Sequence, residues 1–243
     1  MSREKSGMPL YLKQLLAGRD FATTNNFASQ MANFVYLVGD EEQRICMVVD
    51  PAWDIPGIVE FIDREEMELT GALITHYHPD HVGGEILGHR IAGLSELLAI
   101  RAVKVHVNEV ECEGLKQLTG LSESDLRRHR GGDVVTVGGV KIELLHTPGH
   151  TPGSQCFLVD SALVSGDTLF IGGCGRVDLP GGDSTQMYYS LTRVLSNLPD
   201  NTVLFPGHDY APKPTSTIGE EKRQNQCLRM QSLEDWMSLM GEV

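Results

Sequence analysis

The loop LITHYHPDHVGG, residues 73–84, gathers side chains that bind metals. Three histidines and one aspartate lie within six residues of it: His76, His78, Asp80 and His81. Imidazole and carboxylate are the usual protein ligands of zinc and of non-haem iron. Because the loop follows an apolar run that is typical of a buried strand, the pattern predicts a metal site at a strand end and not a chance polar loop.

Three further candidate ligands follow later strand-like runs. His150 lies in HTPGHTPGS, Asp167 in SGDTLF and His208 in FPGHDY. Side chains at the ends of neighbouring strands can converge at one sheet edge although they are far apart in the sequence. The seven candidates can then serve two metal positions, with His76, His78 and His150 at the first, Asp80, His81 and His208 at the second, and Asp167 bridging both.

Two neighbouring cations would give this site hydrolytic chemistry. They would lower the pKa of a bridging water, polarise a carbonyl and stabilise the oxyanion that forms on attack. Such a reaction needs no serine or cysteine nucleophile. We assign Asp80 a catalytic role as well as a metal-binding one. A non-catalytic metal-binding module is disfavoured, because structural sites use four ligands and keep no open position.

Strands and helices intersperse along the chain in a way that indicates an α/β protein. Predicted strands cover 33–40, 44–50, 71–76, 103–107, 154–160, 162–167 and 201–208, and two more flank a hairpin turn at Gly138-Gly139. Helical patterns cover 55–67, 83–100, 108–130 with a break near Gly120, 183–199, and the residues from about 219. No linker or repeat divides the chain, so residues 1–243 are predicted to form one domain with short C-terminal helices.

Composition argues against several classes of function. The 243 residues carry a formal net charge of −13, so we expect neither nucleic acid nor a membrane surface as a partner. The five cysteines are odd in number and form no CxxC pair, which favours a reducing compartment over a disulfide framework. Residues 1–20 contain no apolar run typical of a signal peptide or a membrane span, and we therefore expect a cytoplasmic protein.

The four motifs THYHPDHVGG, HTPGHTPGS, SGDTLF and FPGHDY resemble, in order and spacing, those of the metallo-β-lactamase fold superfamily. The resemblance covers nearly the whole chain. It implies an α/β fold built as a four-layer αβ/βα sandwich. In this fold two mixed sheets lie face to face, helices cover their outer faces, and the metal site lies at one sheet edge.

Within that superfamily the chain is similar to two groups of enzymes, the small glyoxalase II enzymes and the persulfide dioxygenases. GDTLFIGGCGRVDLPGGD and STIGEEKRQN resemble segments shared by both groups, HPDHVGG is more similar to the hydrolases, and GHDY resembles the dioxygenases. The leading hypothesis is a glyoxalase II-like hydrolase of a hydroxyacyl-glutathione thioester, with a hydroxide that bridges two divalent ions and zinc as the expected metal. The alternative is a persulfide dioxygenase that oxidises glutathione persulfide with one iron, bound by His76, His150 and Asp167.

The resemblance also points to residues that could bind substrate: Arg176, Tyr210, Lys222 and Arg223. Arg176 could hold a substrate carboxylate, or it could pair with Asp178 in its own loop. Lys222 and Arg223 could bind glutathione carboxylates or form a solvated helix face, and Tyr210 could orient His208. Since 35 residues follow His208 in this sequence, we do not expect the helical glutathione-binding domain of full-length glyoxalase II among them.

Two segments, 85–103 and 108–131, are longer than the matching segments of the small relatives. We expect the first, which contains EILGHRIAGLSELLAI, to cover the metal site as a lid or to form a homodimer contact. In either case it would influence the choice of substrate. The expected partner is a small thioester or another glutathione-derived molecule.

Overall fold

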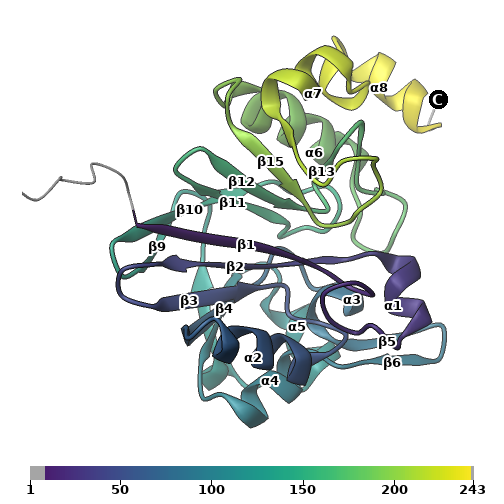
Figure 1. Cartoon of the computed structure of the whole chain (residues 1–243). Helices are drawn as coiled ribbons and strands as arrows, with labels where there is room; N and C mark the ends of the chain where they lie inside the picture. The colour runs from purple at the N-terminus through teal and green to yellow at the C-terminus, as the bar shows by residue number, and fades with distance from the viewer. Residues whose placement is uncertain (1–8, 242–243) are drawn as a thin grey trace, which may run out of the picture.

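The computed structural model describes residues 9–241 and contains two six-stranded sheets that lie face to face (Figure 1). The first sheet contains β1 (Leu10–Leu16), β2 (Phe34–Asp40), β3 (Ile45–Val49), β4 (Glu68–Leu73), β7 (Lys104–Asn108) and β8 (Leu126–His129), in that spatial order. The second contains β9 (Val134–Val137), β10 (Val140–His146), β11 (Gln155–Val159), β12 (Ala162–Gly166), β15 (Val203–Pro206) and β16 (Ser216–Thr217), in the order β16-β15-β12-β11-β10-β9.

Both sheets mix parallel and antiparallel pairs. In the first, β1 to β3 are antiparallel neighbours and β3, β4, β7 and β8 run parallel. In the second, β12 and β15 are parallel and their neighbours are antiparallel. Two small hairpins complete the strands: β5 (Gly84–Ile86) with β6 (His89–Ile91), and β13 (Leu169–Phe170) with β14 (Gly173–Cys174).

Helices cover the outer face of each sheet. Below the first sheet in Figure 1 lie α2 (Ile55–Arg64), α4 (Leu94–Ile100) and α5 (Cys112–Thr119). Above the second lie α6 (Ser184–Tyr189), α7 (Ile218–Gln224) and α8 (Leu233–Met240), while α1 (Asn26–Met31) and α3 (Pro79–Val82) lie at one end of the sandwich. The predicted four-layer αβ/βα arrangement is confirmed. Among the residues described, no helix is long and apolar enough to cross a membrane.

Strands that are buried on both faces separate three apolar layers. In β2, Phe34 and Tyr36 belong to the layer between the sheets, while Val35 and Leu37 belong to the layer under the first sheet. Successive side chains of a strand point to opposite faces, so a strand covered on both sides needs a continuous apolar run. The third layer lies between the second sheet and its helices, where Trp236 is fully buried.

Residues 83–100, predicted as one helix, form the β5–β6 hairpin followed by α4, so the helix prediction was wrong for the first part of this segment. Three glycines explain the difference. Gly83, Gly84 and Gly88 have φ angles of +91°, +137° and +81°, and an α-helix cannot continue through such a backbone. The tip of the hairpin presents Leu87, which is 90% exposed.

Residues 108–130, predicted as a broken helix, are α-helical only in α5. Gly120 ends this helix with a φ of 73°, and its N–H bonds to the carbonyl of Lys116. After a 3-10 turn at Glu123–Asp125 the chain enters β8, which pairs with β7 at the sheet edge. The predicted second helical piece was therefore wrong. The exposed Arg127 and Arg128 gave this strand a polar pattern, and its pairing with β7 is not local.

The indole of Trp236 joins α8 to α6, because its N–H donates to the carbonyl and to the hydroxyl of Ser184 at 2.8 and 2.9 Å. We expect Trp236→Phe to lower the free energy of unfolding by about 1–3 kcal/mol, since two buried acceptors lose their donor and the site loses volume. Leu239→Ala, at an exposed position of the same helix, should change it by less than about 0.5 kcal/mol. Urea unfolding followed by far-UV circular dichroism measures both values. A second transition in the wild-type curve would contradict the predicted single domain.

Candidate metal centre

Every predicted ligand lies in a loop or short helix that follows a strand. β4 ends at Leu73, and His76 follows in the next loop, before α3. Asp80 and His81 lie within α3, and His78 immediately precedes it. The second sheet supplies the other three ligands, with His150 in the loop after β10, Asp167 directly after β12 and His208 shortly after β15.

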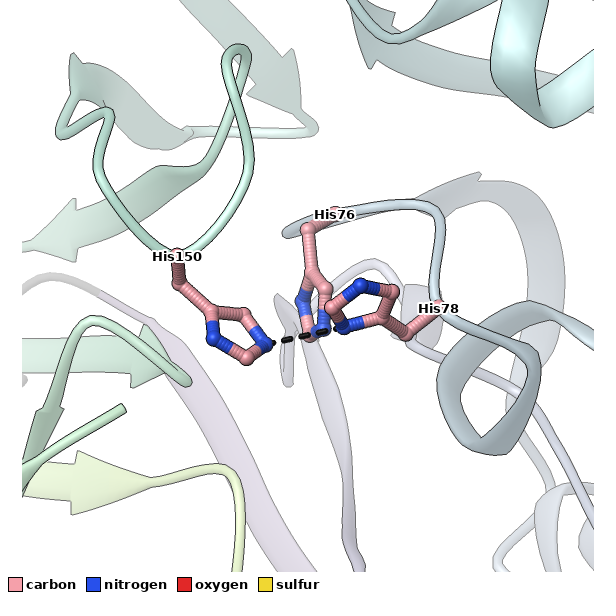
Figure 2. A group of neighbouring side chains, drawn as sticks. All are labelled: His76, His78 and His150. Carbon is pink, nitrogen blue, oxygen red and sulfur yellow. Dashed lines mark hydrogen bonds between the residues drawn. The ribbon is translucent and has the colours of Figure 1, made fainter. Parts of the chain in front are cut away.

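The first donor set consists of His76, His78 and His150, whose donor atoms all lie within 4.8 Å of one another. Figure 2 shows His76 and His78 on one loop facing His150 on another. Nδ1 of His78 lies 2.9 Å from Nε2 of His150. His76 is 1% exposed, and its Nε2 makes no hydrogen bond. Three imidazoles from two loops therefore surround one point.

The second donor set consists of Asp80, His81 and His208. Nε2 of His81 lies 3.3 Å from Nε2 of His208, and Oδ2 of Asp80 lies 3.4 and 3.5 Å from these two nitrogens. Asp167 lies between the two sets, because its carboxylate is 3.6 Å from Nε2 of His150 and 3.3 Å from both Nε2 atoms of the second set. The structure thus brings all seven predicted ligands together.

The hydrogen bonds of the imidazoles favour metal binding. Nδ1 of His150 and of His208 each donates to a backbone carbonyl, of Arg176 and Met31, at 2.7 Å. Nδ1 of His81 lies 3.0 Å from Oδ2 of Asp50. An imidazole that donates through Nδ1 keeps the lone pair of Nε2 for a cation. Facing lone pairs repel one another in a buried site unless a cation lies between them, and Oδ1 of Asp167 also lacks a hydrogen bond. The residues present therefore fit two metal ions.

The electrostatics of the two sets differ. Burial lowers the pKa of His76 well below its usual value and that of His78 to about 4, and neighbouring imidazoles add to both shifts. Both shifts favour the neutral ring, the form that binds metals. Burial also disfavours charge on His81, but the carboxylates of Asp80 and Asp167 outweigh it and raise its pKa. The second position therefore lies in a negative field that would attract a cation.

Sequence reasoning missed two residues that hold these ligands. Asp50 accepts hydrogen bonds from the N–H of Thr75 at 2.8 Å and from its hydroxyl at 2.5 Å, besides its contact with His81. Asn33 donates to Asp80 at 3.0 Å and accepts from the indole of Trp53 at 2.9 Å. Asp50 could have been found, because it ends an apolar strand run in the same way as Asp167. No comparable pattern surrounds Asn33.

A cavity of about 520 Å³ opens onto the metal centre. Five predicted ligands line it, together with an apolar wall of Met31, Ile86, Phe170, Leu179 and Pro180. Arg176 and Tyr210, both predicted to bind substrate, also line it. The ring of Tyr210 stacks on His208 with centroids 4.7 Å apart, and the guanidinium of Arg176 pairs with Asp178 at 2.8 and 2.7 Å.

Lys222 and Arg223, the other two predicted substrate-binding residues, do not line this cavity. They lie on α7, on the outer side of the second sheet. Nζ of Lys222 donates to the carbonyl of Leu198 at 2.9 Å and to Asp200 at 2.7 Å. This placement agrees with the alternative of a helix face, and the two residues enter no further part of the proposed site.

The family model of the metallo-beta-lactamase superfamily matches residues 30–208, and the chain belongs to this superfamily. The probable hydroxyacylglutathione hydrolase glo2 of Schizosaccharomyces pombe is 37% identical over 198 residues, which cover 76% of this chain and 68% of that protein. The mitochondrial persulfide dioxygenase ETHE1 of Homo sapiens is 29% identical over 245 residues, which cover 99% and 84%.

A solved structure shows the similarity to one of these relatives, ETHE1, in three dimensions. The crystal structure of ETHE1 from Myxococcus xanthus matches with a TM-score of 0.77 and 30% identity, over 95% of this chain and 90% of that one. The predicted resemblance to both enzyme groups is confirmed, and so is the prediction that the chain is an enzyme of this superfamily. The names of these relatives leave the reaction open between hydrolysis and oxygenation.

Asp50 offers a test of the second donor set. We expect Asp50→Asn to weaken metal binding at one of the two positions by about 10–100-fold, because the partner that orients His81 loses its charge. Asp63→Asn, at an exposed residue that pairs with Arg101, is the matched control and should bind as the wild type does. Competition with a chromophoric chelator measures both affinities. Wild-type affinity at both positions in Asp50→Asn would contradict the assignment.

Proposed function

We propose that the protein is a metal-dependent thioester hydrolase of the glyoxalase II type, acting on hydroxyacyl-glutathione or a related small thioester with two divalent ions, for which zinc is the expected metal. The observation that carries the proposal is the pair of complete donor sets with Asp167 between them. A single metal held by His76, His150 and Asp167 would leave four other donors of the same site without a role, three of them buried.

Two bound cations would supply an acidified water and a site for the oxyanion. The chain itself supplies the geometry around them. Asp80 lines the cavity beside the second donor set, where its carboxylate can accept a proton from an incoming water. The apolar wall excludes bulk water and suits the acyl part of a thioester. Arg176 offers a cation at the same cavity for a substrate carboxylate.

The persulfide dioxygenase is the second candidate, and specific observations favour it. His76, His150 and Asp167 form two histidines and one carboxylate, the ligand type of many mononuclear iron oxygenases. Tyr210 and Arg176, from the GHDY and GCGR motifs, both face the cavity. The match to human ETHE1 also extends over 99% of this chain.

The proposal also covers the cellular compartment and the partners of the enzyme. All five cysteines are free thiols, which supports an enzyme of a reducing compartment such as the cytoplasm. The net charge of −13 supports a small-molecule substrate and neither nucleic acid nor a membrane surface. A homodimer through the segment 85–103 stays a prediction.

Elemental analysis of protein purified without added metal should find two divalent ions per chain. A chelator should abolish hydrolysis of acyl-glutathione thioesters, and zinc should restore it, because the donor sets alone provide no nucleophile. Thiol release measured with a disulfide reagent follows the reaction. One iron per chain together with oxygen uptake on glutathione persulfide would overturn the hydrolase and establish the second candidate.

The β5–β6 hairpin supplies a test of substrate choice. Ile86 lines the cavity, whereas its neighbour Leu87 is exposed. We expect Ile86→Ala to lower kcat/KM for the best apolar acyl thioester by about 10-fold or more, since one missing methylene in an apolar pocket is worth about 1–3 kcal/mol and this change removes three carbon atoms. Leu87→Ala should leave kcat/KM unchanged. Equal values for both variants and the wild type across acyl lengths would show that the hairpin does not shape the acyl site.

A further inference from the structure

A buried carboxylate outside the metal centre connects the two loops of the first donor set. Glu111 directly precedes α5, lies in the long segment 108–131 and is 2% exposed. Its Oε2 accepts the backbone N–H of Tyr77 at 2.8 Å. Its Oε1 accepts the hydroxyl of Thr151 at 2.9 Å and the N–H of Gly153 at 2.6 Å.

These three donors belong to the two loops that carry the first donor set. Tyr77 lies between His76 and His78, and Thr151 follows His150. One carboxylate group thus holds both sides of the point that the three imidazoles surround. A displacement of either loop away from Glu111 by one ångström would break at least one of these bonds, because N–H···O hydrogen bonds span only about 2.7–3.2 Å and a contact at about 3.6 Å is no longer one.

The close approach of α5 to both loops independently supports the connection that Glu111 makes between them. A Cβ atom at Gly153 would lie 2.6 Å from Cγ of Glu111, so only glycine leaves room for the carboxylate. At Gly114, in the first turn of α5, a Cβ would lie 3.2 Å from the ring of Tyr77. The start of the helix is thus fitted to the loop of His150 at one point and to the loop of His76 and His78 at another.

The position of Glu111 is itself held by its neighbours. Its N–H donates to the carbonyl of Asn108 at 3.0 Å, at the end of β7. The N–H of Leu115 donates to the carbonyl of Glu111 at 2.9 Å, in the first turn of α5. The carboxylate is therefore anchored to the first sheet, while two of its three donors belong to a loop of the second.

We propose that Glu111 is a positioning residue for the first donor set, whose carboxylate fixes the loop of His76 and His78 against the loop of His150. The segment 108–131 then acts as a scaffold of the metal centre. The inference rests on the metal-binding part of the proposed function and does not depend on the substrate.

Glu111→Gln keeps the size of the side chain but replaces one acceptor oxygen with a donor. Whichever way the amide turns, at least one backbone N–H then faces another donor. We expect affinity at one metal position to fall by about 10–100-fold, with the other position within about twofold of the wild type. Chelator competition measures both. Asp50→Asn should weaken the other position, so the two variants together assign the two binding steps.

Glu113→Gln is the matched control, because Glu113 lies on α5, is exposed and pairs with Lys116 and Arg128. It should bind both ions as the wild type does. If Glu111→Gln does not fold, Thr151→Val and Thr151→Ser decide, since valine removes one bond to Glu111 and serine retains the hydroxyl. We expect valine to weaken one position and serine to restore it.

Three results would overturn the inference: unchanged affinities in Glu111→Gln, an equal fall at both positions, or, where the glutamine variant is unfolded, equal binding by the two Thr151 variants. An equal fall would mean that Glu111 stabilises the whole domain and does not position one donor set. Failure of the wild type to bind any divalent ion is a different result, and it would refute the proposed function instead.

Discussion

The buried imidazole of His81 lies 3.0, 3.4 and 3.3 Å from the carboxylates of Asp50, Asp80 and Asp167, and the rest of the structure is arranged around this contact. His81 is 1% exposed, and each of the three aspartate residues is at most 9% exposed. Removing one partner of such a buried group costs about 3–5 kcal/mol. Asp50 and Asp80 follow strands of the first sheet, and Asp167 follows a strand of the second. The contacts of these carboxylates with His81 therefore constrain how the two sheets lie against each other.

The apolar layer between the sheets keeps that meeting point in place. Phe34 and Tyr36 of the first sheet pack with Phe157 of the second. The hydroxyl of Tyr36 also donates to the carbonyl of Pro206 at 2.5 Å, two residues before His208. A sliding of one sheet over the other would break this contact and separate the donor sets. Apolar packing therefore holds the two sheets together, and a few hydrogen bonds fix the loops that carry the ligands.

The lining of the cavity combines polar and apolar chemistry. Five ligands of the metal centre line it together with the apolar residues Met31, Ile86, Phe170, Leu179 and Pro180. The two long segments have different places around this centre. Ile86, from the β5–β6 hairpin, contributes to the cavity wall, whereas the start of α5 contacts the ligand loops from behind through Glu111.

The sequence by itself determined the seven candidate ligands, their division into two sets and the class of fold, because these rest on residue types, on the order of motifs and on apolar runs that must be buried. It also indicated Arg176 and Tyr210, which reach the cavity. Local patterns failed in two places. The strand β8 depends on pairing with β7, which is distant in the sequence, and the hairpin of 83–91 depends on a positive φ at glycines that the helical pattern contained. Asp50 could have been a candidate from its place after an apolar run, but tertiary structure alone showed that it contacts His81, that Asn33 and Glu111 contact the ligand loops, and that Lys222 does not line the cavity. A carboxylate becomes a partner of a ligand loop only when folding brings the two within hydrogen-bonding distance, and no spacing along the chain encodes that distance.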